Sequence, residues 1–228
     1  MKKSPRMRQV QEKLKQVFEG VYEINGKLAT LNLSPGSKVY NEELISIDGV
    51  EYRTWNPYRS KLAAAILKGL KNFKIKSNSN VLYLGAATGT TSSHVSDIAK
   101  NGSVFCVEIS QRNMRELIKV CEIRSNMLPI LADANNVAIY NSIIKECDII
   151  YQDVATPNQA DILEKNSIML KKGGYAYFII KSQSIDISKK PEEVFDMQLG
   201  KLKGFKVLEK IDLEPYDSMH LFAVLKKV

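Results

Sequence analysis

A glycine, three carboxylates and a lysine stand at the ends of successive apolar runs from residue 81 onward, and their types suit a bound nucleoside and a group transfer. These residues are Gly85, Glu108, Asp133, Asp153 and Lys181. In open α/β sheets, ligands lie outside the carboxyl ends of the strands. A single carboxylate there could equally be a helix N-cap or a solvated loop end. Several at successive strand ends favour a site.

A glycine loop follows the first of these apolar runs. Residues 85–89 read Gly-Ala-Ala-Thr-Gly, and hydroxyl residues open the helix expected after them. Glycines let the backbone approach a ligand, and the free N–H groups of a helix N-terminus favour an anionic group. The loop lacks both the G-x-G-x-x-G of dinucleotide enzymes and a Walker motif, and Glu108 follows Gly89 at the spacing of a ribose-binding carboxylate. The pattern favours a nucleoside with a small charged tail, such as S-adenosylmethionine (SAM). The alternative is a βα unit in which the glycine serves only close packing.

Lys181 ends the apolar run 175–180, where an ammonium group is costly unless it is paired. Asp153, at a neighbouring strand end, is the natural partner, although Lys181 could instead extend to solvent. Lysines and carboxylates beside a SAM site suit methyl transfer to a poor nucleophile. A ribose 2′-hydroxyl is such a nucleophile, because ammonium groups can steady its oxygen while the enzyme aligns it.

Strand-like and helix-like segments alternate from residue 56 to the C-terminus. Strands are predicted at 81–84, 104–108, 128–131, 147–152, 175–181, 205–213 and 220–225, and helices near 62–69, 91–100, 111–124, 136–145, 157–170 and 191–203. This alternation predicts an α/β fold with a mostly parallel, Rossmann-like sheet covered on both faces. The last two strands, joined by a turn at 214–218, predict a hairpin that adds an antiparallel edge.

The first 55 residues have a different pattern. The apolar period of 10–18 predicts a helix, and short β-type runs follow between residues 20 and 53. Asn25-Gly26 and Asp48-Gly49 are hairpin signals. We therefore expect a small, mainly β domain over 1–55 and a SAM-dependent methyltransferase domain over 56–228.

Composition limits the class of protein. The chain has 228 residues, 44% of them hydrophobic, a net charge of +8 and a pI near 9.2. The charge favours a polyanionic partner, although a basic surface can simply keep a protein soluble. Three cysteines without ligand spacing and two histidines make a metal site improbable and fit a reducing compartment. No apolar run has membrane-spanning length, so we expect no membrane partner and a cytosolic or nuclear protein.

Several separated motifs resemble those of the fibrillarin family, the SAM-dependent RNA ribose 2′-O-methyltransferases of box C/D ribonucleoproteins, in their archaeal form. The resemblance runs from about Gly20 to the C-terminus. The matching segments are 53–66 (RTWNPYRSKLAAAI), 84–97 (LGAATGTTSSHVSD), 152–159 (QDVATPNQ) and 213–216 (LEPY).

The resemblance implies site residues by position. SAM contacts would fall on Gly85, Ala86, Thr90, Thr91, Glu108, Ile109, Asp133, Ala134, Asp153 and Gln159, and the catalytic set on Lys61, Asp153, Lys181 and His220. The roles of Lys61 and His220 rest on the resemblance alone. His94 is expected to pack or cap the helix behind the glycine loop. Thr156 stands where many relatives carry glutamine, which puts any contact there in doubt.

The resemblance also implies partners: a box C/D guide RNA with target rRNA or tRNA, a Nop-family scaffold protein and a kink-turn-binding protein. The long Gly/Arg-rich region of eukaryotic relatives is absent, so we expect a cytoplasmic, archaeal-type protein. Two alternatives stay open: a non-catalytic subunit that only shapes the particle, and a methyltransferase for a small molecule or a protein side chain such as glutamine.

Overall fold

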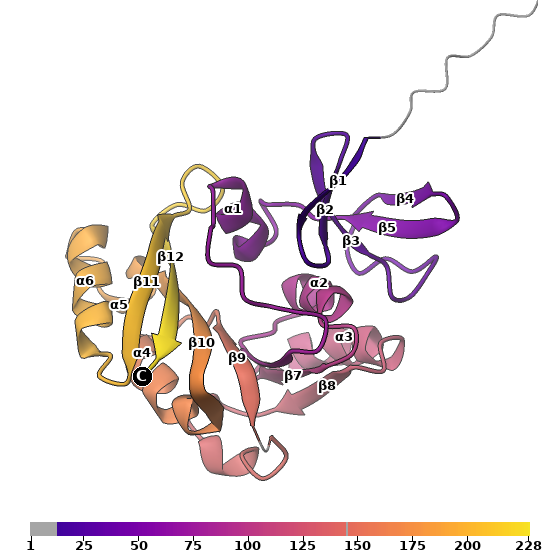
Figure 1. The fold of residues 1–228 in the computed structure, drawn as a ribbon. Coiled ribbons are helices and arrows are strands. Elements are labelled where there is room, and N and C mark those ends of the chain that lie inside the picture. The colour runs from indigo at the N-terminus through magenta and orange to yellow at the C-terminus, as the bar shows by residue number, and fades with distance from the viewer. Residues whose placement is uncertain (1–12, 145) are drawn as a thin grey trace, which may run out of the picture.

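The strands form two sheets that lie side by side. The structure, a computed structural model, describes residues 13–144 and 146–228. A five-stranded sheet is built from the first strands of the chain, and a seven-stranded sheet forms the rest (Figure 1). The boundary predicted at residue 55 falls just after the small sheet ends; that each part is a separate folding unit stays a prediction.

The small sheet is antiparallel throughout, in the order β1-β2-β3-β5-β4. Its strands are β1 (Leu14–Phe18), β2 (Val21–Ile24), β3 (Lys27–Leu31), β4 (Leu44–Ile47) and β5 (Val50–Thr54). Both predicted hairpins are present, and the two central residues of each turn have positive φ: 51° and 81° at Asn25 and Gly26, 50° and 78° at Asp48 and Gly49. These angles match the twist of the flanking strands.

The helix predicted over 10–18 is wrong where the structure describes it, from residue 13 on. Leu14–Phe18 is strand β1, with Leu14 opposite Ile24 of β2. Hydrogen bonding along the free side of β2 and packing of Val17 and Phe18 against the core override the local helical period. Residues 10–12 lie outside the described part.

The large sheet has the order β11-β12-β10-β9-β6-β7-β8. Its strands are β6 (Asn80–Leu84), β7 (Ser103–Glu108), β8 (Met127–Leu131), β9 (Cys147–Gln152), β10 (Leu170–Lys181), β11 (Phe205–Asp212) and β12 (His220–Lys227). β12 is antiparallel to both of its neighbours, so β11 runs with the other strands. The C-terminal hairpin thus forms the predicted edge, with the reversed strand one position in from it.

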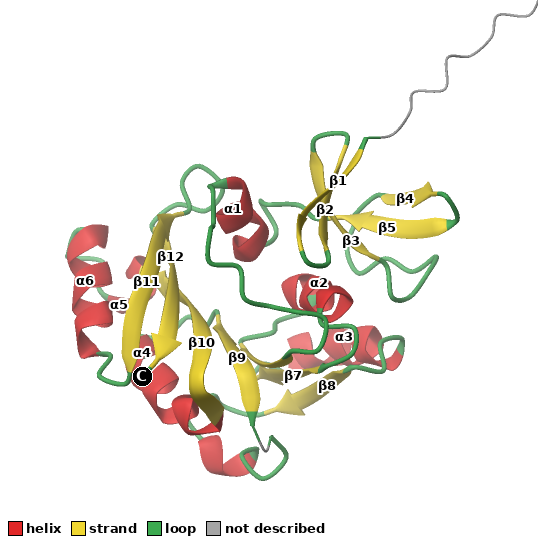
Figure 2. Cartoon of the chain, viewed as in Figure 1, coloured by secondary structure: helices red, strands yellow, loops and turns green. Residues whose placement is uncertain are grey.

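Helices cover both faces of the large sheet (Figure 2). They are α1 (Lys61–Leu67), α2 (Thr90–Ile98), α3 (Gln111–Glu122), α4 (Gln159–Asn166), α5 (Ser182–Ile185) and α6 (Pro191–Lys201), with the 3-10 turns η1 (Val137–Ile139) and η2 (Ser167–Met169). Along β6, Val81 and Tyr83 pack in one core with α1, α2 and α3, whereas Leu82 and Leu84 pack with α4 and α6. This alternation is the period of two of a strand buried on both sides.

The helix predicted at 136–145 is wrong over the described residues, because only the short turn η1 forms there. Ile139 and Ile143 are each 52% exposed, so these apolar side chains do not pack against the sheet as those of a covering helix would. The segment is anchored by Tyr140, whose hydroxyl donates to Asn166 Oδ1 at 2.6 Å.

No helix in the described ranges is long and apolar enough to cross a bilayer.

A buried ionic cluster joins the small sheet to α2. The Arg53 guanidinium lies 2.9 Å from a Glu42 oxygen and 3.4 Å from Asp97 of α2, and all three side chains are fully buried. Arg124, also buried, reaches Asp97 at 3.6 Å. Because α2 begins at the glycine loop, this cluster fixes the loop relative to the small sheet.

Candidate functional site

The glycine loop follows β6, the strand at which the order of strands in the sheet changes direction. β7 and β8 lie on one side of β6 and β9 on the other, which is the topological switch point where doubly wound folds bind ligands. Gly85 has φ +83°, and a Cβ there would lie 2.7 Å from the Asp153 carbonyl oxygen. Gly85 therefore permits close packing, as the alternative interpretation of the loop held, and that packing brings the end of β9 against the loop.

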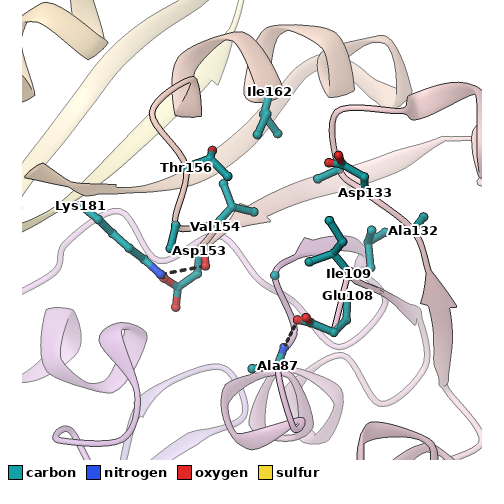
Figure 3. A pocket seen from close by; sticks show the side chains of 14 residues that line it. Ala87, Glu108, Ile109, Ala132, Asp133, Asp153, Val154, Thr156, Ile162 and Lys181 are labelled. Carbon is teal, nitrogen blue, oxygen red and sulfur yellow. Dashed lines mark hydrogen bonds and ion pairs between the residues drawn. The ribbon is translucent and has the colours of Figure 1, made fainter. Parts of the chain in front are cut away.

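A cavity of about 270 Å³ opens at these strand ends. Its lining includes seven of the predicted site residues: Gly85, Glu108, Ile109, Asp133, Ala134, Asp153 and Lys181. Sequence reasoning did not assign the remaining lining residues, which are mostly small or apolar: Ala87, Val107, Ala132, Val154, Ala155, Thr156 and Ile162. Figure 3 shows Lys181 and Asp153 at one end of the cavity, with Glu108, Ile109 and Asp133 at the other.

Glu108 is held in place by the backbone. One carboxylate oxygen accepts the N–H of Ala87 and the other that of Ser110, each at 2.8 Å. A carboxylate oxygen has two lone pairs, so both can still accept a hydroxyl. This oriented carboxylate fits the two hydroxyls of a ribose.

The neighbouring surface fits a purine. The Ile109 side chain is 64% exposed although it is apolar and beside the cavity. Asp133 Oδ1 accepts the backbone N–H of Asn135 at 2.8 Å, which fixes a carboxylate that can accept an exocyclic amine. The hydroxyl oxygen of Thr156 is buried in the lining without a hydrogen-bond partner among the described residues, which also indicates a place for a polar ligand atom.

Four predicted cofactor contacts are not among the lining residues: Ala86, Thr90, Thr91 and Gln159. The Thr91 hydroxyl donates to Ser60 Oγ at 3.0 Å, and Ser60 caps the N-terminus of α1, where Lys61 stands. Gln159 Oε1 accepts the backbone N–H of Lys181 at 3.1 Å. Both side chains therefore support the two lysines from behind; their direct contact with a cofactor stays a prediction.

Asp153 lies between two lysines at the mouth of the cavity. Lys181 Nζ is 2.7 Å from Asp153 Oδ1, and Lys61 Nζ is 3.3 Å from Oδ2. Lys181 also donates to the Asp153 carbonyl oxygen at 3.0 Å. The pairing of Lys181 with Asp153 that the sequence predicts is confirmed, and Lys61 joins the same carboxylate.

Asp217 extends this cluster, and sequence reasoning missed it. Its Oδ2 lies 3.3 Å from Lys61 Nζ, and its Oδ1 lies 2.9 Å from His220 Nδ1. The structure thereby brings all four predicted catalytic residues into one network. The available signal was an acidic residue three positions before His220, in the hairpin turn.

For Lys61 and Asp217, partial burial and the neighbouring groups shift the pKa in opposite directions. Burial lowers the pKa of Lys61, but the Asp153 and Asp217 carboxylates outweigh it and the pKa is raised. Burial raises the pKa of Asp217, but the hydrogen bond from His220 and the charge of Lys61 outweigh it and the pKa is lowered. Lys61 thus remains an ammonium and Asp217 a carboxylate at neutral pH.

His94 has no place in this cavity. It is fully buried against the small sheet and stacks on Trp55 at 4.7 Å. Among the described residues, no group of three or more His, Cys, Asp or Glu side chains is arranged to hold a metal ion.

The fold and the cavity define a doubly wound α/β protein with a nucleoside site at its switch point. The Fibrillarin family model matches residues 9–228, and the chain belongs to this family. It is 49% identical over 220 residues to the "Fibrillarin-like rRNA/tRNA 2′-O-methyltransferase" of Methanocaldococcus jannaschii, with 93% of this chain and 96% of that protein covered.

Two solved structures of similar proteins indicate ligands and partners for those proteins. Fibrillarin of Aeropyrum pernix, described with natively bound S-adenosyl-L-methionine, is 40% identical with a TM-score of 0.87 and covers 95% of this chain and 98% of that one. The fibrillarin of a fibrillarin/Nop5p complex is 38% identical with a TM-score of 0.86 and covers 94% and 100%.

Proposed function

We propose that this protein is the SAM-dependent ribose 2′-O-methyltransferase of a box C/D ribonucleoprotein, acting on rRNA or tRNA. The names of its relatives support this substrate class. The observation that carries it is the Lys61–Asp153–Lys181 cluster at the mouth of a cavity that fits a nucleoside.

The residues that line the cavity form two groups, one at each end. Glu108 would hold the ribose of SAM, and Ile109, Asp133 and Ala134 the adenine, with Asp153 near the charged tail. When bound, SAM supplies an electrophilic methyl group on a sulfonium. The lysine cluster marks the end of the cavity where the acceptor must arrive.

The cluster suits a hydroxyl acceptor of low reactivity. Two ammonium groups share the Asp153 carboxylate and Lys61 also pairs with Asp217, so the charges of this network balance, but each ammonium group keeps one N–H donor that these contacts do not use. A positive charge fixed beside the acceptor oxygen stabilises negative charge as it develops during transfer. Both lysines are held by ion pairs, so this stabilisation requires little rearrangement.

We further propose that the protein works in a particle with a Nop-family scaffold, a kink-turn-binding protein and a guide RNA. The complex of a relative with Nop5p supports the scaffold. Base pairing with the guide would supply the target sequence, so this chain itself need not recognise bases.

The test is methyl transfer from labelled SAM to a short RNA, with the chain alone and with the reconstituted particle. We expect label at one ribose 2′-oxygen opposite the guide, only in the full particle. Lys181→Met should abolish it, whereas Lys119→Met, at a lysine whose side chain is 67% exposed on α3, should not. Label on protein instead of RNA would overturn the proposed substrate.

A further inference from the structure

The four predicted catalytic residues meet through a carboxylate that has no assigned role. We propose that Asp217 is a positioning residue: it holds His220 with the proton on Nδ1, so that Nε2 accepts the proton of the ribose 2′-hydroxyl. This inference rests on the function proposed above.

The contacts of His220 fix its tautomer. Nδ1 lies 2.7 Å from the carbonyl oxygen of Ser218 and 2.9 Å from Asp217 Oδ1. A carbonyl oxygen and a carboxylate can only accept, so Nδ1 carries the hydrogen. In the neutral ring Nε2 then has a free lone pair, and it makes no hydrogen bond within the described residues. The side chain is 21% exposed, so Nε2 is open to a substrate.

His220 stands on the same side of the sheet as the lysine cluster. It is paired across the strands with Lys181, and side chains that are directly opposite in an antiparallel pair share a face. The charged groups around the ring come from every neighbouring element: Asp217 of the turn, Lys181 of β10, Lys61 of α1 beyond Asp217, and Asp153 of the loop after β9.

The turn that carries Asp217 is held on several sides. The N–H groups of Tyr216 and Asp217 both donate to the carbonyl of Leu213, at 2.9 and 3.2 Å. Lys68, the C-cap of α1, donates to the Glu214 carbonyl at 2.6 Å, and the Tyr216 ring meets that of Tyr58 edge-on at 5.1 Å. Asp217 is therefore positioned before substrate arrives.

The proton has a complete path. As the acceptor oxygen bonds to the methyl carbon, the bond from that carbon to the sulfonium sulfur breaks and leaves a thioether, and a neutral His220 can receive the proton of the oxygen on Nε2. The resulting imidazolium is paired with the Asp217 carboxylate and later releases the proton to water. The lysines suit the other role: Lys61 is kept as an ammonium by two carboxylates and Lys181 lies 2.7 Å from Asp153, so both donate to the oxygen.

The first experiment uses nuclear magnetic resonance of the whole free chain and needs no turnover. The chain has two histidines, so ¹⁵N imidazole spectra assign both rings with one His220→Gln variant. We expect the Nδ1–H tautomer for His220. In Asp217→Asn the share of the Nε2–H tautomer should rise, because a neutral amide oxygen accepts from Nδ1 more weakly than a carboxylate does. Asp217→Glu should restore the wild-type tautomer.

The matched control is Asp212→Asn. Asp212 lies at the other end of the same turn and accepts the Glu214 N–H at 3.0 Å, without contact to His220 or Lys61. This variant should leave the His220 tautomer unchanged, which separates loss of the Asp217 carboxylate from disruption of the turn.

The second experiment measures rates in the reconstituted particle. His220→Gln should lower kcat by about 10²- to 10⁴-fold, the usual contribution of a general base, with little change in KM. Asp217→Asn should lower kcat less, again with little change in KM, and Asp217→Glu should recover kcat.

An Nε2–H tautomer in the wild type, or an unchanged tautomer and kcat in Asp217→Asn, would overturn the assignment. Absence of RNA methylation by the wild-type particle would instead overturn the proposed function, and the tautomer would still be decided by the spectra.

Discussion

At the scale of single residues, the site combines a fixed carboxylate for binding with a shared carboxylate for chemistry. Glu108 is oriented by two backbone N–H groups, whereas Asp153 is oriented by two lysines. The first arrangement leaves a negative charge for hydroxyl donors. The second holds two ammonium groups whose remaining N–H donors can point at an oxygen that becomes negative. The two carboxylates thereby serve opposite roles within one cavity.

Lys181→Met should lower kcat by about 10²- to 10³-fold, comparable with loss of one donor to a developing oxyanion, and leave SAM affinity nearly unchanged. The ammonium touches Asp153 at the reacting end and is remote from Glu108 (Figure 3). Calorimetry of SAM binding checks the affinity, and single-turnover kinetics in the particle check the rate of methyl transfer. Equal losses in affinity and turnover would assign Lys181 a structural role.

Glu108→Gln should weaken SAM binding and leave kcat nearly unchanged, the reverse of Lys181→Met. An amide has only one oxygen to accept the two N–H groups that Glu108 now binds, and it loses the charge that strengthens bonds to ribose hydroxyls. We expect SAM to bind about 10- to 100-fold more weakly, as for 1.5–3 kcal/mol of lost charged hydrogen bonds, with kcat at saturating SAM largely kept. Glu116→Gln, at an exposed residue of α3, is the control; unchanged affinity for Glu108→Gln would reject the ribose role.

At the scale of elements, the site depends on where strands end and on what supports the helices that follow. The Thr91 hydroxyl of α2 donates to Ser60, the residue that caps α1, so the helix carrying Lys61 is tied to the glycine-loop helix. α2 is in turn supported from behind by His94, which lies on the buried side of that helix.

The hydrogen bonds of His94 require a neutral ring. Thr30 donates its hydroxyl proton to Asp97, so Nδ1 of His94 must donate to Thr30 Oγ1 at 2.8 Å. Nε2 lies 3.4 Å from an Arg53 nitrogen, which can only donate, so Nε2 accepts; the Tyr40 hydroxyl, 2.7 Å from Nε2, also lies 3.2 Å from the Thr54 carbonyl oxygen. Burial and the charges of Arg53 and Arg124 place the pKa of His94 well below its usual value.

A pH dependence of stability follows. The unfolded chain binds a proton on His94 below about pH 6.5 and the folded chain does not, so stability falls as pH falls through that value. Between pH 7 and pH 5 this amounts to about 2 kcal/mol. Urea unfolding at both values should show the loss, and His94→Gln should show a smaller one.

Asp97 titrates in the same range but affects both proteins alike. Its burial raises its pKa to about 6 against the pull of Arg53 and Arg124. The difference between wild type and His94→Gln therefore reports on the histidine. An identical pH dependence in the two would show that folding does not change the pKa of the ring, against the lowering described above.

At the scale of the whole molecule, the two sheets behave as one body because charges are buried between them. Arg53 of β5 pairs with Glu42 in the loop before β4 and with Asp97 of α2, with no side-chain exposure. The apolar core is shared as well, since Val21, Leu28 and Trp55 pack in the same cluster as α1 and α2.

Arg53→Met should lower the free energy of unfolding by about 3–5 kcal/mol, because Glu42 and Asp97 lose a buried partner. Lys27→Met removes an ion pair of similar length, 2.7 Å to Glu43, but both its side chains are more than half exposed. That change should cost about 1 kcal/mol or less. Urea denaturation of both variants makes the comparison; equal small losses would mean that the buried cluster does not join the sheets.

The sequence by itself determined the elements with strong local signals. Apolar runs specified the strands of the large sheet, and Asn25-Gly26 and Asp48-Gly49 specified two turns, because few residues adopt positive φ without strain. Polar residues at strand ends indicated the cavity, since parallel strands bring their carboxyl ends to one edge.

Only the tertiary structure decided the rest. Strand β1 forms because β2 offers it a hydrogen-bonding edge, which no local period encodes. Asp217 connects Lys61 and His220 because a hairpin turn meets the start of α1, and Arg53 meets Asp97 because a small sheet packs on α2. These contacts join residues far apart in the chain, and the burial that gives them their energy exists only after the chain has folded.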